Sequence, residues 1–344
     1  MNLLKVAIAG ATGYSGEELI RLLIGHPGIE LVCVTSRGNA GRRIEEVFPR
    51  FQGQKYAELP FSDSEPGAIV ASGAQVAFLA LPHGAAAPFA LALLGAGVRV
   101  IDLSADFRIK EPAVYREFYG EAHPAPELLR ESVYGIPELY RAELRTARLV
   151  ASAGCYPTSV ILPLHPLLKA GLIDPASIVV TSMSGVSGAG RNVAAEYLYV
   201  ECNENARPYG VPKHRHLGEI EQELSAAAGE RVVINFTPHL IPVTRGILTT
   251  IHAMPRPGIR SEAITGALEA AYGAEMFIRL QGEKGTVELR NVAHSNFLDI
   301  AWRHDPRTGR VILMSAEDNL VKGAAGQAVQ NLNVMCGWAE STAL

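Results

Sequence analysis

The feature that most constrains the fold is a glycine-rich turn near the N-terminus, between a short apolar run and a helical pattern. The apolar run covers residues 4–9 (LKVAIA), and residues 17–24 carry apolar side chains at helical intervals. Glycines in such a strand–turn–helix let the backbone approach a pyrophosphate, which binds at the helix N-terminus. An ordinary tight turn would show the same glycines. The residues that we expect at a dinucleotide site are Gly10, Thr12, Gly13, Tyr14, Ser15 and Gly16.

Strand-like and helix-like segments alternate after this turn. Apolar runs with strand character occur at residues 30–35, 75–81, 98–103 and 148–152, and residues 85–96 form a helical stretch between two of them. Alternation of this kind is typical of a parallel sheet with helices on both faces. We therefore predict an α/β fold for the first part of the chain.

The pattern changes after residue 155. Helices are expected at residues 157–169, 217–228 and 319–334, with Pro163 and Pro166 bending or ending the first of them. The expected strands cover residues 178–184, 232–237, 246–254, 286–290, 297–303 and 311–315. This order favours a second domain with a mixed, mostly antiparallel sheet and a few helices. Two domains also suit a chain of 344 residues.

The end of the second expected strand indicates which dinucleotide is bound. An acidic residue at this point would hold the ribose 2′-hydroxyl of NAD. The chain instead has Ser36 and Arg37, a hydroxyl and a guanidinium that suit a 2′-phosphate. We therefore expect NADP(H), although Arg37 could also be a solvated loop residue.

Cys155 is the strongest candidate for a nucleophile. It follows Gly154 and precedes an expected helix, where the free N–H groups and the helix dipole lower the pKa of a thiol. Cys33 and Cys336 lie in apolar segments, and Cys202 has no evident activating neighbour. A buried cysteine with a packing role remains the alternative for Cys155.

A nucleophilic thiol needs a proton partner, and residues 213–216 (KHRH) supply two candidates, His214 and His216. Arg215 could bind an anion or pair with Glu219. The cluster could also be no more than a polar helix entry. No third ligand accompanies the two histidines, so we predict no metal site.

Two further segments follow expected strands and could contact ligands. Ser104 and Arg108 lie where the edge of the first sheet would place a ligand, with capping by Asp106 and a surface ion pair of Arg108 as the alternatives. A second Gly/Ser loop at residues 184–191 could let a nicotinamide or a substrate approach the backbone, or could be a plain flexible loop. The residues of interest in that loop are Ser184, Gly185 and Gly188.

Composition excludes several classes of protein. The net charge is −4 without a Lys/Arg block, so we expect no nucleic-acid partner. No apolar run reaches membrane-spanning length and no signal peptide fits the N-terminus. Four cysteines without C-x-x-C spacing suggest a reducing compartment, and we expect a cytoplasmic protein with no membrane partner.

These motifs together resemble the N-acetyl-gamma-glutamyl-phosphate reductases of arginine biosynthesis, which are related to aspartate-semialdehyde dehydrogenase. The resemblance extends over essentially the whole chain. Its markers are residues 9–16 (AGATGYSG), 103–108 (LSADFR), 154–158 (GCYPT), 184–190 (SGVSGAG), 214–216 (HRH), 219–222 (EIEQ), 236–242 (FTPHLIP) and 245–246 (RG). One departure precedes the thiol, where the family pattern Asn-Pro-Gly-Cys is replaced by Ser152-Ala153-Gly154-Cys155.

The resemblance implies an architecture and an assembly. A Rossmann-type NADP domain would cover residues 1–153 and be completed by a C-terminal helix at 316–344, and an α+β substrate and dimerisation domain would cover 154–315. Asn319 would lie near the nicotinamide. The assembly would be a homodimer or homotetramer.

The resemblance also implies a reaction. The Cys155 thiolate would attack the acyl phosphate of N-acetyl-L-glutamyl 5-phosphate, and NADPH would reduce the resulting thioester to the 5-semialdehyde. A histidine would supply the proton, and we favour His214 as the acid/base and His216 as a substrate contact. The candidates for contact with the substrate are Ser104, Arg108, Ser152 and Arg245.

Other functions on the same scaffold remain open. One is an acyl-phosphate reductase that acts on aspartyl phosphate or on a carrier-linked aminoadipyl or glutamyl phosphate. Another is a non-catalytic NADP-binding sensor, against which the presence of both Cys155 and the histidine pair argues.

Overall fold

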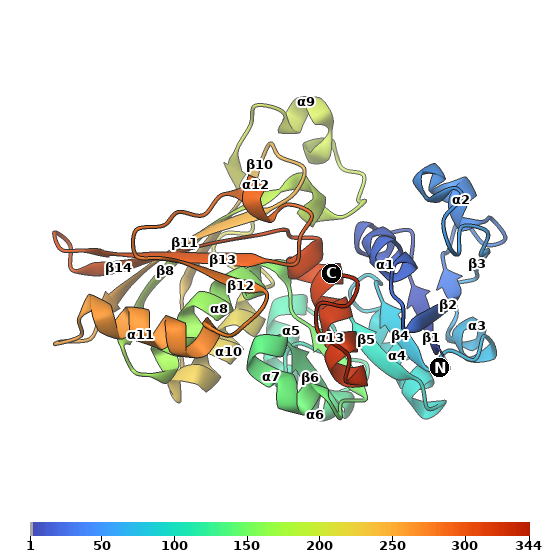
Figure 1. The fold of residues 1–344 in the computed structure, drawn as a ribbon, viewed down its shortest axis with the longest axis horizontal. Helices are drawn as coiled ribbons and strands as arrows, with labels where there is room; N and C mark the ends of the chain where they lie inside the picture. The colour runs from blue at the N-terminus through green and yellow to red at the C-terminus, as the bar shows by residue number, and fades with distance from the viewer. Residues whose placement is uncertain (1–2) are drawn as a thin grey trace. The chain divides into compact units, whose positions relative to one another are not determined.

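The structure is a computed structural model that describes residues 3–344, and its chain forms two compact units (Figure 1). Unit 1 contains the chain up to Arg116, Gly120–Ala153 and Ala324–Leu344, and unit 2 contains Glu117–Tyr119 and Gly154–Gly323. The chain therefore rejoins unit 1 at Ala324 and not at residue 316. The reason is that residues 316 and 317 still belong to a strand of unit 2, β14 (Arg310–Glu317).

Unit 1 is built on a seven-stranded parallel sheet with the order β3-β2-β1-β4-β5-β7-β6. The strands are β1 (Leu4–Ala9), β2 (Ile29–Thr35), β3 (Phe61–Ser62), β4 (Val76–Leu79), β5 (Arg99–Asp102), β6 (Val133–Gly135) and β7 (Leu149–Ser152). The α/β fold predicted from the sequence is confirmed. Strands β3 and β6 were not predicted, because two or three residues are too short to show an apolar period.

Helices cover both faces of this sheet. The helices of unit 1 are α1 (Tyr14–Ile24), α2 (Ile44–Val47), η1 (Pro49–Phe51), α3 (Pro66–Ala71), α4 (Ala86–Gly95), α5 (Pro112–Tyr119, whose last three residues belong to unit 2), α6 (Leu128–Glu131), α7 (Pro137–Leu144) and α13 (Gly326–Cys336). Alternate residues of β1 serve the two faces: Val6 and Ile8 pack in the core that contains Leu19 and Leu332, whereas Ala7 packs in the other core. Burial on both faces explains the nearly continuous apolar strands.

Unit 2 is built on a mixed seven-stranded sheet with the order β12-β13-β14-β11-β8-β10-β9. Its strands, besides β14, are β8 (Ile173–Gly185), β9 (Arg207–Pro208), β10 (Asn235–Ile241), β11 (Ile247–Pro255), β12 (Ile278–Gly282) and β13 (Leu298–Asp305). Among the described strand pairs of this sheet, only β8–β10 and β12–β13 are parallel. The predicted mixed, mostly antiparallel sheet is therefore confirmed.

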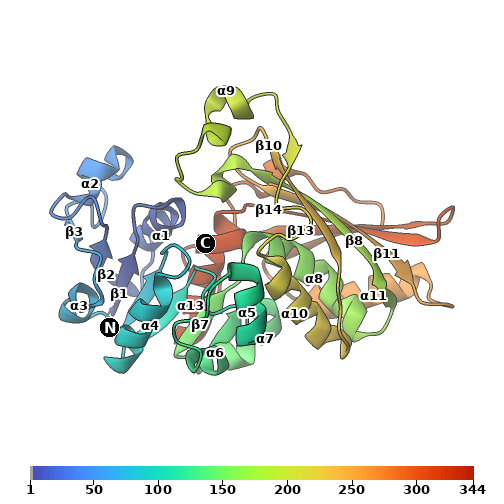
Figure 2. The same ribbon diagram turned by 180° about the vertical axis from the view of Figure 1, so that it is seen from behind.

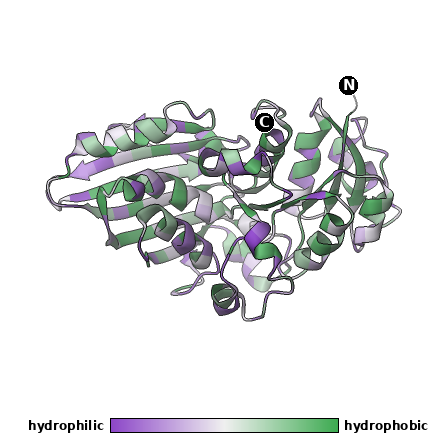
Figure 3. Ribbon diagram, turned by 90° about the horizontal axis from the view of Figure 1, so that it is seen from below, coloured by the Kyte–Doolittle hydropathy of each residue, from purple (hydrophilic) through white to green (hydrophobic). Residues whose placement is uncertain are grey.

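Three long helices cover one face of this sheet: α8 (Cys155–Lys169), α10 (Leu217–Ala228) and α11 (Ser261–Tyr272) (Figures 1 and 2). In Figure 3 the helices beside the sheet carry both hydrophobic and hydrophilic residues, as expected where one side of a helix packs and the other meets water. Helix α8 begins two residues earlier than predicted and continues through Pro163 and Pro166. The sequence suggested that the prolines would bend or end this helix, and neither of them ends it.

The shorter elements of unit 2 are η2 (Val186–Ala189), η3 (Ala195–Tyr197), α9 (Tyr199–Cys202) and α12 (Leu289–Val292). The π-helix η4 (Val321–Ala325) begins in unit 2 and ends in unit 1. The predicted strand at residues 286–290 is wrong, because α12 occupies part of this segment. Val287 and Val292 pack there in a small cluster with Ala301 and Ala316, one from the irregular segment before α12 and the other from α12 itself. No helix among residues 3–344 has the length and apolarity needed to cross a bilayer.

Candidate active site

The glycine-rich turn joins β1 to α1, and two of its glycines have no room for a side chain. Gly10 has a φ of +75°, and a Cβ there would lie 2.4 Å from the carbonyl oxygen of Ala80. A Cβ on Gly16 would lie 2.5 Å from the carbonyl oxygen of Gly10. Gly13 is the N-cap of α1, and Tyr14 is its first residue. The turn therefore brings the backbone N–H groups of the first helical turn close to β1, as a phosphate site requires.

The end of β2 lies against this turn. The hydroxyl oxygens of Thr12 and Ser36 are 3.1 Å apart, and the Gly10 N–H donates to Thr35 Oγ1 at 3.3 Å. Arg37 is exposed and makes no hydrogen bond or ion pair with residues 3–344. The guanidinium is therefore available to an anionic ligand beside the Ser36 hydroxyl.

Ser104 and Arg108 are both engaged within unit 1. The Ser104 hydroxyl donates to Asp102 Oδ2 at 2.7 Å, and burial raises the pKa of Asp102 to about 7, helped by the nearby Asp106. Arg108 is buried and donates to the carbonyl oxygens of Ser152 and Leu103, both at 2.8 Å. These contacts hold the loop after β5 in place, and they occupy the groups that the sequence suggested for substrate.

Asp106 caps a helix, which is the alternative role that the sequence suggested for this residue. Its carboxylate accepts hydrogen bonds from the N–H groups of Gly84, Ala86 and Ala87 at 2.8–3.1 Å, at the start of α4. His83 Nδ1 lies 2.9 Å from the same carboxylate. Asp106 therefore stabilises the N-terminus of α4.

Ser152 differs from these neighbours. It ends β7, three residues before Cys155, and its side chain is only 1% exposed. Its hydroxyl has no hydrogen-bond partner among the described residues, although its carbonyl oxygen holds Arg108. A buried hydroxyl without a partner is uncommon and can serve a ligand.

Cys155 is the first residue of the 15-residue helix α8, and Gly154 is the N-cap. This position favours the thiolate, because the first N–H groups of a helix and its dipole attract negative charge. The Gly154 N–H donates to Glu219 Oε2 at 3.2 Å, and Glu219 is wholly buried. A carboxylate from α10 therefore anchors the residue that immediately precedes the thiol.

The same carboxylate reaches one of the two histidines. His216 Nε2 lies 4.0 Å from Glu219 Oε1, with both side chains largely buried. His216 is also the N-cap residue of α10, so the helix start fixes its backbone. Glu219 thus connects His216 with the N-terminus of α8.

His214 is held in a different way. Its Nδ1 accepts a hydrogen bond from the His216 N–H at 3.1 Å, and its ring packs against the rings of Tyr156, Tyr209 and Phe236. Burial lowers the pKa of His214 to about 4, and the charge of Arg215 acts in the same direction. His214 is therefore neutral near pH 7.

The second Gly/Ser loop and the segment after β14 come together in unit 2. Asn319 Nδ2 donates to Ser187 Oγ at 3.0 Å, and Asn319 Oδ1 accepts from the Gly246 N–H at 2.7 Å. A Cβ on Gly188 would lie 2.9 Å from Ser184 Oγ, and one on Gly185 would lie 2.8 Å from the backbone nitrogen of Arg245. The structure therefore groups Ser184, Gly185, Gly188 and Asn319, as a shared ligand site would need.

Arg245 belongs to the same neighbourhood. Its Nη1 lies 3.5 Å from Asp318 Oδ2, and its side chain is 15% exposed. Asp318 is wholly buried and also accepts hydrogen bonds from the N–H groups of Leu320 and His294. Asp318 thereby holds the guanidinium close to the segment that contains Asn319.

The sequence suggested no site role for Glu317 or Tyr209, and it placed Gly323 only within the returning segment of residues 319–324. A Cβ on Gly323 would lie 2.7 Å from Cys155 Cβ and 3.0 Å from Glu317 Oε1, so η4 closely approaches the thiol-bearing residue. The Tyr209 hydroxyl donates to the Tyr156 hydroxyl at 2.8 Å, next to Cys155 in the chain. Only the glycine could have drawn attention, as a small residue in a helical segment.

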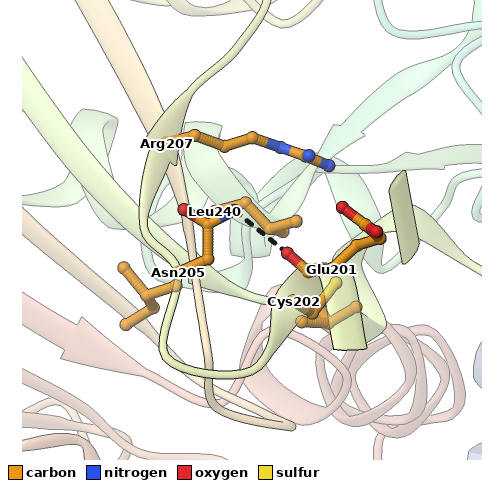
Figure 4. Close-up of a pocket in the computed structure, with 7 residues that line it drawn as sticks. Glu201, Cys202, Asn205, Arg207 and Leu240 are labelled. Carbon is orange, nitrogen blue, oxygen red and sulfur yellow. Dashed lines mark hydrogen bonds between the residues drawn. The ribbon is translucent and has the colours of Figure 1, made fainter. Parts of the chain in front are cut away.

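Cys202 is the last residue of helix α9 in unit 2. It lines a pocket with Glu201, Asn205, Arg207 and Leu240 (Figure 4). The pocket is also lined by Val186 and Ile241. None of the residues predicted for the catalytic, cofactor or substrate sites lines this pocket.

Comparison with known proteins identifies the group to which the chain is related. The protein is 56% identical over 344 residues to N-acetyl-gamma-glutamyl-phosphate reductase of Akkermansia muciniphila, covering 100% of this chain and 99% of that protein. The chain belongs to the N-acetyl-gamma-glutamyl-phosphate reductase family. Another member of the family, from Syntrophobacter fumaroxidans, is 48% identical over 342 residues, covering 99% of this chain and 98% of that protein. The resemblance inferred from the motifs is confirmed.

Domain profiles and solved structures agree with this family. The NAD-binding domain of semialdehyde dehydrogenase matches residues 5–147, and the semialdehyde dehydrogenase dimerisation domain matches residues 155–319. The fold is similar to aspartate semialdehyde dehydrogenase II of Vibrio cholerae complexed with ASA, with a TM-score of 0.72 at 18% identity, covering 98% of this chain and 99% of that chain. It is also similar to the Candida albicans aspartate semialdehyde dehydrogenase with NADP, with a TM-score of 0.73 at 16% identity, covering 97% and 99% of the two chains. This reductase-family chain is thus an oxidoreductase with a nicotinamide cofactor domain.

Proposed function

We propose that the protein reduces N-acetyl-L-glutamyl 5-phosphate to N-acetyl-L-glutamate 5-semialdehyde and phosphate with NADPH, as a step of arginine biosynthesis. The names of its full-length relatives support this substrate. The observation that carries the chemistry is the placement of Cys155 at the N-terminus of α8, next to a backbone N–H held by Glu219. A nucleophile at that position suits covalent reduction of an acyl phosphate.

The residues of the glycine-rich turn fit NADP(H). Gly10 and Gly16 keep side chains away from the first turn of α1, where a pyrophosphate would bind. Ser36 and the exposed Arg37 offer a hydroxyl and a guanidinium to a 2′-phosphate. We assign the nicotinamide to the group formed by Ser184, Gly185, Gly188 and Asn319. When bound, NADPH supplies the hydride of the reaction.

Cys155 would act as the acyl acceptor. Its thiolate attacks the acyl carbon, a C–S bond forms, the C–O bond to phosphate breaks, and phosphate leaves with the bonding electrons. The resulting thioester is less prone to hydrolysis than the acyl phosphate. After reduction, the C–S bond of the thiohemiacetal breaks, and the aldehyde and the thiol are released.

We assign the proton transfer to His216 rather than to His214, which reverses the preference drawn from the sequence. Glu219 lies 4.0 Å from His216 Nε2 and can stabilise an imidazolium there. His214 instead uses Nδ1 to accept a backbone hydrogen bond, and its low pKa disfavours protonation near pH 7. His214 would hold the His216 backbone in position.

Among the predicted substrate groups, Arg245 has the strongest support. Its guanidinium is partly exposed, and it lies beside the segment that contains Asn319. Arg108 and Ser104 have less support, because unit 1 already occupies their polar groups. Ser152 remains a candidate because its buried hydroxyl has no partner among the described residues.

A homodimer is the assembly that we propose. The face of the unit 2 sheet opposite α8 leaves Val179 and Met183 of β8 exposed at 40% and 38%, between half-buried residues of β10 and β11. Exposed apolar residues on the face of a dimerisation domain suit contact with a second copy. A homotetramer would need a second interface at another surface of the chain.

The cytoplasm is the compartment that we propose. The four cysteines are free in the structure. An oxidising compartment promotes disulfides, so free thiols suit a reducing compartment such as the cytoplasm. Catalysis by Cys155 also requires a reduced thiol.

The reaction is tested in reverse, by phosphate-dependent reduction of NADP⁺ with N-acetylglutamate 5-semialdehyde. Turnover of this substrate at least tenfold above aspartate semialdehyde and above carrier-linked aminoadipate or glutamate semialdehydes supports the proposal. Equal or faster turnover of one of those aldehydes would assign the protein to the corresponding reaction instead. No turnover with any of them, combined with NADPH binding, favours a non-catalytic sensor.

A further inference from the structure

Glu317 brings a second buried carboxylate to the catalytic cysteine. The side chain of Glu317 has no exposure to solvent. A Cβ on Gly323 would lie 2.7 Å from Cys155 Cβ and 3.0 Å from Glu317 Oε1. Because both distances are measured from the same point, Glu317 Oε1 lies at most 5.7 Å from Cys155 Cβ.

The register of β14 explains this placement. Alternate residues of the strand, including Leu313 and Ser315, are buried on the face covered by α8. Ser315 Oγ donates to the Ser159 carbonyl oxygen at 2.7 Å, one turn after Cys155 in α8. Glu317 is two residues further along β14, so its side chain lies on the same face as Ser315 and toward the start of the helix.

Gly323 leaves the space between the two groups without a side chain. Any larger residue at position 323 would place its Cβ within 3.0 Å of both Glu317 Oε1 and Cys155 Cβ. With glycine at position 323, no side chain from this residue separates the Glu317 carboxylate from Cys155. In a buried site, a charge has a strong effect on a neighbouring ionisable group.

Several other charged groups lie in the segment after β14 or at the start of α10, which packs against α8. Glu219 from α10 accepts the Gly154 N–H, and His216 lies beside Glu219. Lys322 in η4 is wholly buried, with its ammonium over the Phe277 ring. Asp318, next to Glu317 in the chain, pairs with Arg245. The start of α8 and the two cations favour the thiolate, whereas the carboxylates oppose it.

We propose that Glu317 is a positioning residue that makes the Cys155 thiol less acidic and thereby preserves its nucleophilicity. A thiolate whose conjugate acid is too strong is a weaker nucleophile, and the best attacking thiols ionise near the working pH. Glu317 would keep Cys155 as a thiol that His216 can deprotonate. This inference rests on the proposed role of Cys155 as the acyl acceptor.

The test is the pH dependence of Cys155 alkylation by iodoacetamide in the absence of substrate. The peptide of residues 149–169 contains Cys155 as its single cysteine, so mass spectrometry reports this thiol alone. In Glu317→Gln we expect the pKa of Cys155 to fall by about 1 unit, because a neighbouring negative charge is lost. Glu223→Gln, which neutralises a buried carboxylate that contacts Gln222, should leave the pKa unchanged.

An unchanged or raised pKa in Glu317→Gln would overturn the proposal. Glu317→Met provides a second neutral variant, and thermal unfolding identifies which of the two folds. If neither folds, Glu317 is a structural residue and the proposal fails as well. The alkylation measurement needs no turnover, so it can fail while the reductase assay succeeds, and the reductase assay can fail while the pKa shift is observed.

Discussion

Glu219 accepts a hydrogen bond from the backbone N–H of Gly154 at 3.2 Å, although 65 positions separate the two residues in the chain. The bond joins helix α10 to the N-cap of α8 and so fixes the residue before Cys155. Because Glu219 Oε1 also lies 4.0 Å from His216 Nε2, one buried carboxylate is close to both the residue before the proposed nucleophile and the proposed acid/base.

Glu219→Gln should therefore reduce kcat about 10- to 100-fold, because the neutral amide no longer stabilises the imidazolium of His216. The KM for the acyl phosphate should change less than threefold, since the substrate is not the direct partner of Glu219. Steady-state kinetics of the variant provide the measurement. Glu230→Gln, at an exposed position paired with Arg256, is the matched control. A Glu219→Gln enzyme with wild-type kcat would remove Glu219 from the mechanism.

The buried state of His214 predicts a pH dependence of stability. Its pKa is about 4 in the folded chain and near 6.5 when unfolded, so the unfolded state binds more protons between these values. His214 therefore favours the folded state above pH 6.5, and this advantage is lost as the pH falls toward 4.

In His214→Gln, the decline in the free energy of unfolding between pH 6.5 and 4 should be smaller by on the order of 2 kcal/mol than in the wild type. Urea unfolding across this pH range measures the difference. His165 has a pKa lowered in the same way, to about 4, and its own decline should persist in the variant. Parallel pH profiles for wild type and His214→Gln would show that His214 does not titrate as the structure implies.

Cofactor choice is tested at Arg37. Arg37→Ala should raise the KM for NADPH at least tenfold and that for NADH less than twofold, because only NADPH carries the 2′-phosphate. Initial rates with each cofactor give both values. Arg50→Ala, an exposed arginine that pairs with Glu17, serves as a control for the loss of a surface charge. Equal effects on the two cofactors would mean that Arg37 does not contact the phosphate.

The open face of the unit 2 sheet predicts how the chain associates. Met183→Glu places a charge in the middle of this face and should convert a dimer into monomers, because an unpaired charge is costly to bury in an interface. Light scattering coupled to size-exclusion chromatography measures the mass. Val70→Glu, on an exposed position of α3, should retain the wild-type mass. A Met183→Glu protein of unchanged mass would place the interface elsewhere.

Local patterns in the sequence located several main elements of the fold, although α11 and β12 were not predicted. The 3.6-residue period located α10 at its observed bounds, and the apolar runs located β1 and β2 to within one residue. The short strands β3 and β6 gave no periodic signal. The alternating apolar residues at 286–290 imitated a strand, because Val287, Leu289 and Val292 pack in a small cluster around α12.

The candidate site also combines features that the local sequence predicts with features that depend on tertiary contacts. The glycines of the first turn and the position of Cys155 could be inferred locally, since each depends on a helix that starts beside it. The choice between His214 and His216 depends on Glu219 and on the aromatic rings around His214, which only the tertiary structure supplies. The approach of Gly323 and Glu317 to Cys155 is a contact across more than 160 positions, for which a single sequence carries no signal.

The most direct test of the covalent mechanism is to capture the acyl group on Cys155. The wild-type protein is mixed with N-acetyl-L-glutamyl 5-phosphate without NADPH, quenched in acid, and digested for mass spectrometry. We predict an N-acetylglutamyl thioester on the peptide of residues 149–169, removed by hydroxylamine and absent from Cys155→Ser, which should also lack turnover. Full turnover by Cys155→Ser, or an acyl group on a different residue, would contradict the account.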